Sequence, residues 1–259
     1  MIVPALQDNH ITLELSGQGA PVALLSIRSA GSMRYQPGVH NPKREAWLRA
    51  VGFDPDRVLA LPLVHSRRVY RARVPADLTG LEGDGIVTDN PDAYPVLTVA
   101  DCMPIFLFDP DSGAFGVLHS GWKGTGILAE ACRLMVAEFG TRASRLSVAI
   151  GPCVGVCCYP VDEERAAVFS NEFGSSAVVR QDGLPRLDLI TANLALAENL
   201  GISTITVLDI CTSCDLNLGS YRREGPLEFT RMAAAIGYPR ATSGAPGAIS
   251  GCPPAVAGD

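Results

Sequence analysis

The chain has 259 residues, of which 47% are hydrophobic and 19% charged, a balance typical of a globular protein rather than a disordered one. This length allows one large domain or two small ones, with a sizeable core. The formal net charge of −6 argues against a nucleic-acid partner, because grooves that bind nucleic acids collect positive charge.

The sequence also bears on the compartment. No apolar run approaches the length of about 20 residues that a transmembrane helix needs. Residues 1–5 lack the basic stretch followed by an apolar stretch that begins a signal peptide. We therefore expect a cytoplasmic protein without a membrane partner. In that setting reduced thiols or metal ligands are expected rather than disulfides. The eight cysteines are Cys102, Cys132, Cys153, Cys157, Cys158, Cys211, Cys214 and Cys252.

Apolar patterns predict the elements of the fold. In chain order they predict a strand at residues 22–28, a helix at 41–52, strands at 57–66, 68–74, 96–102, 104–109 and 114–119, a helix at 125–140, a strand at 145–151, helices at 162–174 and 187–201, and a strand at 205–211. The turn residues DPDSG predict a hairpin between the strands on either side of them. Gly140 is expected to end its helix and Asp188 to cap the next-but-one helix.

Strands outnumber helices in this pattern and include a hairpin. These features favour a mixed α/β (α+β) sandwich over a strictly alternating doubly wound sheet. We expect a single domain over residues 1–240. Residues 241–259 are mostly Ala, Gly, Pro and Ser, which predicts a flexible tail that includes Cys252.

Two histidines and a cysteine end strand-like runs. His65 closes LPLVHS, Cys102 closes LTVADC and His119 closes FGVLHS. Together they could ligate one soft metal ion and leave a fourth position open, as catalytic zinc sites do. The alternative is that they are ordinary residues at sheet ends, with Cys102 as a small buried apolar side chain. The neighbouring Asp101 could orient a ligand, act as a base, cap a turn or make a structural hydrogen bond.

Two further segments could bind an anion. The glycines of GWKGTG (121–126) permit close backbone approach, and Lys123 adds positive charge; the alternative is a solvated lysine. The segment SYRREG (220–225) presents Arg222 and Arg223, whose guanidinium groups match phosphate or carboxylate; the alternative is a surface salt bridge.

The remaining cysteines form two groups. CTSC (211–214) has a metal-ligand spacing, and CVGVCC (153–158) adds further thiols. A zinc ribbon or a redox pair is the candidate role. The pattern disfavours a ribbon, because Cys211 follows an apolar strand and the second group lacks the pair spacing.

The motifs, taken in order, resemble one family. LVHSRRV, GDGIVTD, ADCMP, HSGWKGT and IGPCVGVCCYPV, followed by CT and SYRREG, resemble the YfiH/LACC1 family, also called the laccase-domain or multicopper polyphenol oxidase family, over most of residues 60–236. The resemblance implies an α/β/β/α layered sandwich. It also implies that His65, Cys102 and His119 ligate one metal, usually zinc.

The resemblance further implies an activity. Family members phosphorolyse purine nucleosides: adenosine or inosine and phosphate become free base and ribose 1-phosphate. Adenosine deamination, methylthioadenosine cleavage, phenol oxidation and the editing of peptidoglycan precursors are also attributed to the family. We expect a zinc-dependent purine nucleoside phosphorylase that acts on adenosine and inosine, with guanosine and methylthioadenosine as candidate further substrates and adenosine deamination as a candidate side activity. Lys123, Arg222 and Arg223 would hold phosphate, and Asp101 would manage a proton or orient a ligand.

Some residues depart from the family pattern, and some alternatives stay open. Residues 27–33 match its first motif only loosely, Val64 replaces its usual glutamine, and its terminal Gly-Arg reads Thr230-Arg231. A copper-dependent polyphenol oxidase is one alternative, since the same ligands bind copper. Four histidines are too few for the four coppers of a laccase. A peptidoglycan-precursor editing factor is the other alternative, and no pattern sets an oligomeric state.

Overall fold

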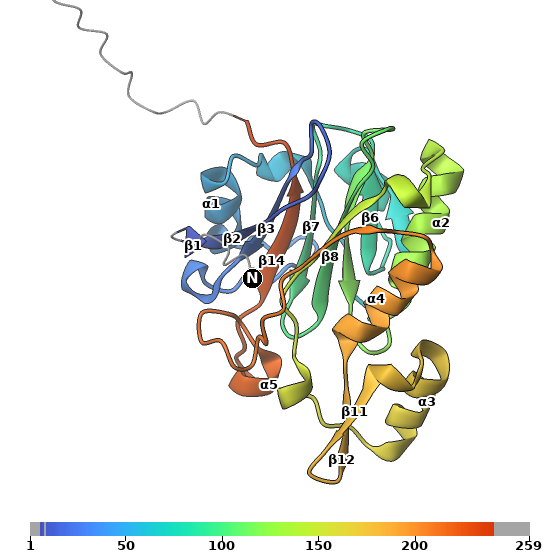
Figure 1. Ribbon diagram of the computed structural model, residues 1–259. Coiled ribbons are helices and arrows are strands. Elements are labelled where there is room, and N and C mark those ends of the chain that lie inside the picture. Colours follow the sequence, from blue (N-terminus) through green and yellow to red (C-terminus); the bar gives the residue numbers. More distant parts are fainter. Residues whose placement is uncertain (1–5, 8, 241–259) are drawn as a thin grey trace, which may run out of the picture.

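Two β-sheets pack face to face between helices in the computed structural model, which describes residues 6–7 and 9–240 (Figure 1). The first sheet has the strand order β1-β2-β3-β14-β7-β4 and the second β13-β10-β8-β9-β6-β5, and β11 and β12 form a separate hairpin. The strands of the first half of the chain are β1 (Leu6–Gln7), β2 (His10–Leu13), β3 (Val22–Ser26), β4 (Val58–Leu59), β5 (Val69–Arg71), β6 (Gly85–Thr88), β7 (Tyr94–Val99) and β8 (Met103–Phe108). Those of the second half are β9 (Phe115–Ser120), β10 (Ser147–Ile150), β11 (Val178–Gln181), β12 (Leu184–Leu187), β13 (Thr204–Val207) and β14 (Met232–Gly237).

Helices cover the outer faces of both sheets (Figure 1). The α-helices are α1 (Pro42–Ala50), α2 (Ile127–Phe139), α3 (Glu163–Phe173), α4 (Leu189–Asn199) and α5 (Tyr221–Glu224). Helix α1 packs Trp47 and Leu48 on the first sheet. Helices α2 and α4 lie over the second sheet, and α3 packs against α4 and the β11–β12 hairpin (Figure 1). Among the described helices, none combines the length and the apolar character that a membrane crossing requires.

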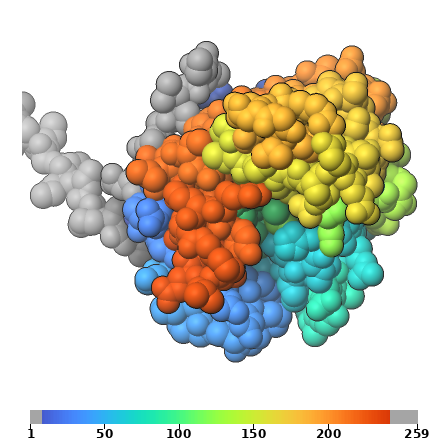
Figure 2. Space-filling model, turned by 90° about the horizontal axis from the view of Figure 1, so that it is seen from below, coloured from blue at the N-terminus to red at the C-terminus, as the bar shows by residue number. Residues whose placement is uncertain are grey.

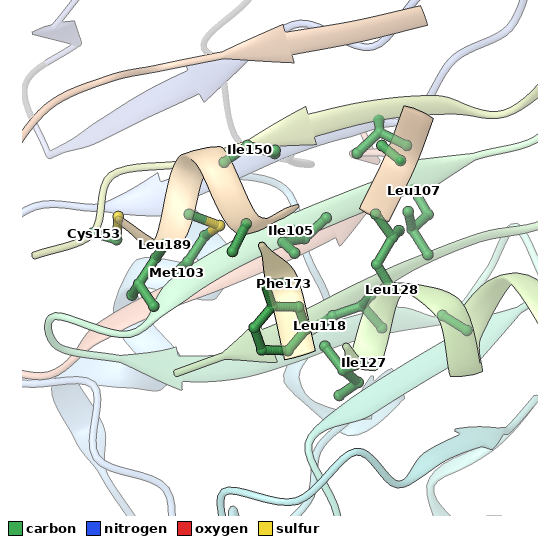
Figure 3. Packing of buried hydrophobic residues seen from close by; sticks show 14 of the residues in the cluster. Met103, Ile105, Leu107, Leu118, Ile127, Leu128, Ile150, Cys153, Phe173 and Leu189 are labelled. Carbon is green, nitrogen blue, oxygen red and sulfur yellow. The ribbon is translucent and has the colours of Figure 1, made fainter. Parts of the chain in front are cut away.

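The layers explain why the strands read as apolar runs. In β14, Met232, Ala234 and Ile236 face the core between the sheets, while Ala233 and Ala235 face the layer of α1. Both faces of such a strand are buried, so apolar residues follow one another without polar alternation. The outer core of the second sheet joins Ile105 and Leu107 of β8 to α2 and α4 (Figure 3).

The predicted fold class is confirmed, and so are the predicted helices and hairpin. Strands β8 and β9 pair antiparallel on either side of the DPDSG turn. The side chain of Asp188 accepts a hydrogen bond from the backbone N–H of Thr191 at the start of α4. Gly140 ends α2 in the left-handed conformation. The boundary at residue 240 and the tail stay predictions, since residues 241–259 lie outside the described ones.

Other elements differ from expectation. The strand predicted at 57–66 is paired only at Val58–Leu59, and a loop follows. Pro62 lacks the N–H that would extend the pairing, and His65 has a φ of 56°, which no strand accommodates. Strand β14 was not predicted because three of its six residues are alanine, a weak strand former. Strands β1, β2, β6, β11 and β12 were also not predicted.

Candidate metal centre

Cys102 lies at the corner where the chain leaves the first sheet at the end of β7 and enters the second as β8. Asp101 turns this corner with a φ of 76°, a left-handed conformation that Asp tolerates better than most residues. Its carboxylate accepts hydrogen bonds from the hydroxyl of Thr212 at 2.7 Å and the backbone N–H of Arg222 at 2.6 Å. Both oxygens therefore hold the corner, which favours a positioning role for Asp101.

His119 lies in β9 and is buried. Its Nδ1 is 2.9 Å from Oδ1 of Asp84, and its backbone N–H donates to the carbonyl of Asp84 at 2.7 Å. The carboxylate can only accept a hydrogen bond, so it draws the ring proton to Nδ1. Nε2 of His119 is then left free as a metal ligand, in the arrangement common among metal-bound histidines.

The same carboxylate positions His65. Oδ1 of Asp84 accepts from the backbone N–H of His65 at 3.0 Å, and Oδ2 accepts from the backbone N–H and the hydroxyl of Ser66 at 2.6 and 2.7 Å. The ring of His65 lies edge-on to that of His119, with 5.0 Å between centroids. One buried acidic side chain thus places both imidazoles, although His65 lies in a loop and not at the end of a strand.

The three side chains fit a single metal ion. The ligand atoms of His65, Cys102 and His119 all lie within 4.8 Å of one another. A tetrahedral zinc ion with bonds of about 2.0–2.3 Å holds its ligand atoms about 3.3–3.8 Å apart, so small side-chain adjustments suffice. Two nitrogens and a sulfur leave a fourth position for substrate, as in catalytic zinc sites. The same donors also suit copper.

The charges at this centre are strongly coupled. Burial raises the pKa of Cys102, but the charge of His119 and hydrogen bonds from both histidines outweigh it and lower that pKa to about 6. Burial lowers the pKa of His119, but the thiolate of Cys102 and the carboxylate of Asp84 raise it to about 10. Without metal, the pair is therefore a thiolate and an imidazolium at neutral pH. A bound cation takes the place of the imidazole proton.

The GWKGTG turn follows His119 directly, and its first glycine touches the centre. A Cβ on Gly121 would lie 2.7 Å from Sγ of Cys102, so any other residue here would force the thiol to move. Glycine at this position therefore leaves room for the thiolate. Lys123 is exposed, with Nζ 5.5 Å from the centre of the Trp122 ring. Its side chain is not among those that line the adjoining cavity, so its phosphate-binding role stays a prediction.

A cavity of about 850 Å³ opens from the centre. Figure 2 shows this face, where blue, cyan, yellow and orange-red parts of the chain surround a hollow with green atoms at its floor. His65, Asp101, Cys102 and His119 all line it. The cavity also brings together four arginines, which are Arg34, Arg165, Arg222 and Arg231. Its aromatic lining consists of Tyr35, Trp122, Tyr159, Tyr221 and Phe229.

The two arginines of SYRREG have different surroundings. Arg222 lines the cavity, and its guanidinium lies 5.6 Å from the centre of the Tyr159 ring. Arg223 instead donates to the backbone carbonyls of Thr212, Ser213, Asp215 and Leu218, and pairs with Glu224 at 2.8 Å. The hydrogen bonds of the Arg223 guanidinium are thus used within the fold, and Arg223 does not line the cavity. Its phosphate-binding role also stays a prediction.

Sequence reasoning missed several residues of this site. Asp84 lies within the quoted GDGIVTD, where an acidic residue between two glycines beside an apolar run was the available signal. Arg34, Arg165 and Arg231 come from separate segments, and no local pattern connects them. Only the tertiary fold brings them to one cavity.

The fold and the site define a layered α/β protein with a candidate three-ligand metal centre in a cationic cavity. The family model described as multi-copper polyphenol oxidoreductase laccase matches residues 36–239, and the chain belongs to this family. The resemblance found in the sequence motifs is thereby confirmed.

Relatives and solved structures agree with this assignment. A purine nucleoside phosphorylase of Deinococcus radiodurans is 37% identical over 194 residues, which cover 74% of each chain. The mouse purine nucleoside phosphorylase LACC1 is 31% identical over 226 residues, 82% of this chain, but the chain spans about half of that relative, 51%. YlmD from Geobacillus stearothermophilus has a TM-score of 0.76 and 27% identity, and the match covers 86% of this chain and 93% of that one.

Removing the charge of Asp84 should weaken metal binding. In the variant Asp84→Asn, one carboxylate oxygen becomes an amide nitrogen, which cannot accept the hydrogen bonds that now orient both histidines. We therefore expect zinc affinity to fall by about 10- to 100-fold. Competition with a fluorescent zinc chelator measures this affinity. Asp111→Asn, which removes the partner of two exposed arginines in the turn between β8 and β9, is the matched control. Unchanged zinc affinity in folded Asp84→Asn would contradict the assigned role.

The low pKa of Cys102 predicts how its thiol reacts. In chelator-treated protein, iodoacetamide should alkylate Cys102 at about pH 7 and slow as the pH falls through about 6, because the thiolate is the nucleophile. His119→Gln removes the stabilising cation and should move the midpoint upward. Peptide mass spectrometry follows the labelling, with Cys132, whose pKa burial raises, as the slow internal reference. A midpoint near the ordinary thiol value of about 8.5 in the unmodified protein would refute the ion pair.

Proposed function

We propose that this protein is a zinc-dependent purine nucleoside phosphorylase. It would convert adenosine or inosine and phosphate into free base and ribose 1-phosphate, accept guanosine and methylthioadenosine, and deaminate adenosine as a side activity. The observation that carries the proposal is that one cavity holds both a candidate three-ligand metal centre and three arginines that form no ion pair within residues 9–240. The names of the Deinococcus and mouse relatives support the same reaction.

The arginines form a candidate phosphate subsite. Within residues 9–240, no carboxylate forms an ion pair with Arg34, Arg222 or Arg231. Burial lowers the pKa of Arg231, and the charge of Arg34 lowers it further, so two like charges share this wall. A bound phosphate would relieve that repulsion. The local positive field contrasts with the net charge of −6 on the whole chain.

The aromatic side chains suit the purine. Rings such as Tyr159 and Trp122 offer apolar faces for stacking, and the volume of about 850 Å³ is ample for a nucleoside. Burial and the charge of Cys102 raise the pKa of Tyr159 to about 12, so this phenol stays protonated at neutral pH. It can therefore donate a hydrogen bond to a nitrogen or oxygen of the substrate.

The reaction exchanges one bond to the anomeric carbon for another. A phosphate oxygen bonds C1′, the bond from C1′ to the purine nitrogen breaks, and its electron pair leaves with the base, which then takes a proton. The arginines would hold phosphate on the face of the ribose opposite the base and restrict it to the orientation from which it can attack C1′. Asp101 would act indirectly, because its carboxylate fixes the backbone of Arg222. A zinc ion on His65, Cys102 and His119 would supply a Lewis acid for developing negative charge.

Copper-dependent phenol oxidation is the second candidate, since the family description and the donor set both allow copper. The other two histidines do not join the site: His10 lies in β2, and His40 pairs with Glu45 of α1 at 2.5 Å. A four-copper centre therefore has too few imidazoles here. The cationic cavity favours a phosphate-containing substrate over a neutral phenol.

The proposed reaction predicts phosphate-dependent base release. Zinc-loaded protein is incubated with adenosine or inosine, with and without phosphate, and base and ribose 1-phosphate are quantified by chromatography. We expect both products only when phosphate is present, and inosine from adenosine as the sign of deamination. His119→Ala is the control and should abolish turnover together with zinc retention. If zinc is bound but neither nucleoside is cleaved, the substrate assignment is wrong; oxygen uptake with phenols or binding of peptidoglycan precursors would support those alternatives.

The phosphate subsite predicts a selective kinetic defect. Arg231→Gln removes a charge-assisted contact, so we expect the KM for phosphate to rise about tenfold or more while the KM for nucleoside changes little. Arg180→Gln is the matched control, because Arg180 lies on the distant hairpin and pairs with Glu163. Lys123→Gln is expected to raise the KM for phosphate less than Arg231→Gln does, because Lys123 does not line the cavity. Equal effects of Arg231→Gln and Arg180→Gln would contradict the subsite.

A further inference from the structure

Four cysteines outside the candidate metal centre converge on one point. Cys157 and Cys158 lie in the short helical turn 156–158, and Cys211 and Cys214 bound the turn that follows β13. Their sulfur atoms all lie within 4.8 Å of one another. Sγ of Cys214 is 3.6 Å from that of Cys157 and 3.4 Å from that of Cys158. The chain therefore assembles a four-thiol cluster from two segments more than fifty residues apart.

We propose that Cys157, Cys158, Cys211 and Cys214 bind a second zinc ion with a structural role. In a tetrahedral site with Zn–S bonds of about 2.3 Å, the sulfur atoms lie about 3.8 Å apart, close to the separations found here. Four thiolates close the coordination sphere, which distinguishes this site from the open three-ligand centre. Cys211 and Cys214 have the Cys-x-x-Cys spacing of zinc ligands, and the adjacent pair at 157–158 supplies the second half that no sequence spacing indicated.

The surroundings suit a cluster of thiolates. The backbone N–H of Gly155 donates to Sγ of Cys211 at 3.3 Å, as amides around metal thiolates do. A Cβ on Gly155 would lie 3.1 Å from Cβ of Cys211, so glycine allows this close approach. The guanidinium of Arg186 donates to the carbonyl of Cys157 at 2.7 Å. Its positive charge is adjacent to a site whose four thiolates and one zinc ion would sum to two negative charges.

The cluster is also exposed enough to require protection. Cys157 and Cys214 are exposed, and Cys158 and Cys211 are partly exposed. Grouped exposed thiols oxidise readily, whereas coordination to zinc ties up their lone pairs. A disulfide between Cys158 and Cys214 would use only two of the four thiols. A single tetrahedral zinc ion uses all four.

Zinc here would brace the wall of the functional cavity. Thr212, between the two ligands of the second turn, donates its hydroxyl to Asp101 and its N–H to the carbonyl of Cys153. Val154, one residue before Gly155, lines the cavity. An ion that joins the two turns would therefore fix the residues that hold the corner of Cys102. The site is independent of the reaction proposed above, since its test reads metal content.

Metal content tests the proposal directly. Protein purified under reducing conditions with zinc supplied should contain two zinc ions per chain by plasma mass spectrometry. The variant His65→Ala/Cys102→Ser, which lacks the first site, should keep one. Cys157→Ser/Cys214→Ser should lose one and keep the other, while the control Cys132→Ser, at a buried position of α2, should keep both. After cobalt exchange, His65→Ala/Cys102→Ser should show the intense charge-transfer absorption of thiolate ligands.

The His65→Ala/Cys102→Ser variant keeps the test decisive even where Cys157→Ser/Cys214→Ser fails to fold, because it leaves all four cluster cysteines in place. If it contains no zinc and gives no cobalt–thiolate band, the second site does not exist. The same conclusion follows if its four cluster cysteines react as free thiols before any chelator is added. A Cys158–Cys214 disulfide found by peptide mass spectrometry in the reduced preparation would equally overturn the proposal. Phosphorolysis can fail without changing any of these readouts.

Discussion

The buried carboxylate of Asp84 is the group on which the candidate metal centre depends. It accepts hydrogen bonds from the ring of His119 and from the 65–66 loop, so it joins a strand of the second sheet to a loop with little pairing of its own. A carboxylate without partners would be costly at this depth. Burial raises the pKa of Asp84, but the bonds from His119 and Ser66 outweigh it and lower that pKa, so the group stays ionised. The hydrogen bonds that satisfy this buried carboxylate are therefore the same ones that orient the two histidine ligands.

Asp101 plays a comparable part for the third ligand. The corner between the sheets needs a left-handed residue, and the bonds from Thr212 and Arg222 offset the strain of that conformation. Cys102 is held next to Gly121, where any side chain would displace it. The centre thus depends on two acidic residues, Asp84 and Asp101, that are not among the three candidate metal ligands but hold the chain around those ligands in place. Rigid ligands of this kind favour a preorganised site.

The predictable parts of the molecule were those with local causes. Helix α4 followed from the cap at Asp188, and the β8–β9 hairpin from a turn-rich pentapeptide. Strand β14 could not be predicted because its alanines are weak strand formers. The strand is stabilised instead by burial on both faces. The three metal ligands could be selected as chemical types at the ends of apolar runs. The role of Asp84 in orienting these ligands could not be predicted, because its hydrogen bonds join residues 18 to 35 positions apart in the sequence.

The cysteines also show that sequence spacing identifies only those parts of a site that lie within one turn. A pair spacing such as Cys-x-x-Cys is a local signal, because one turn positions both thiols. The adjacent pair at 157–158 carries no such signal, yet the pairing of Cys153 with Cys211 brings its turn against the first. The same pairing places Thr212 on Asp101 and Val154 in the cavity wall. A constraint on these two turns therefore acts on the corner that carries Cys102, and the thiol cluster and the candidate metal centre are parts of one connected wall.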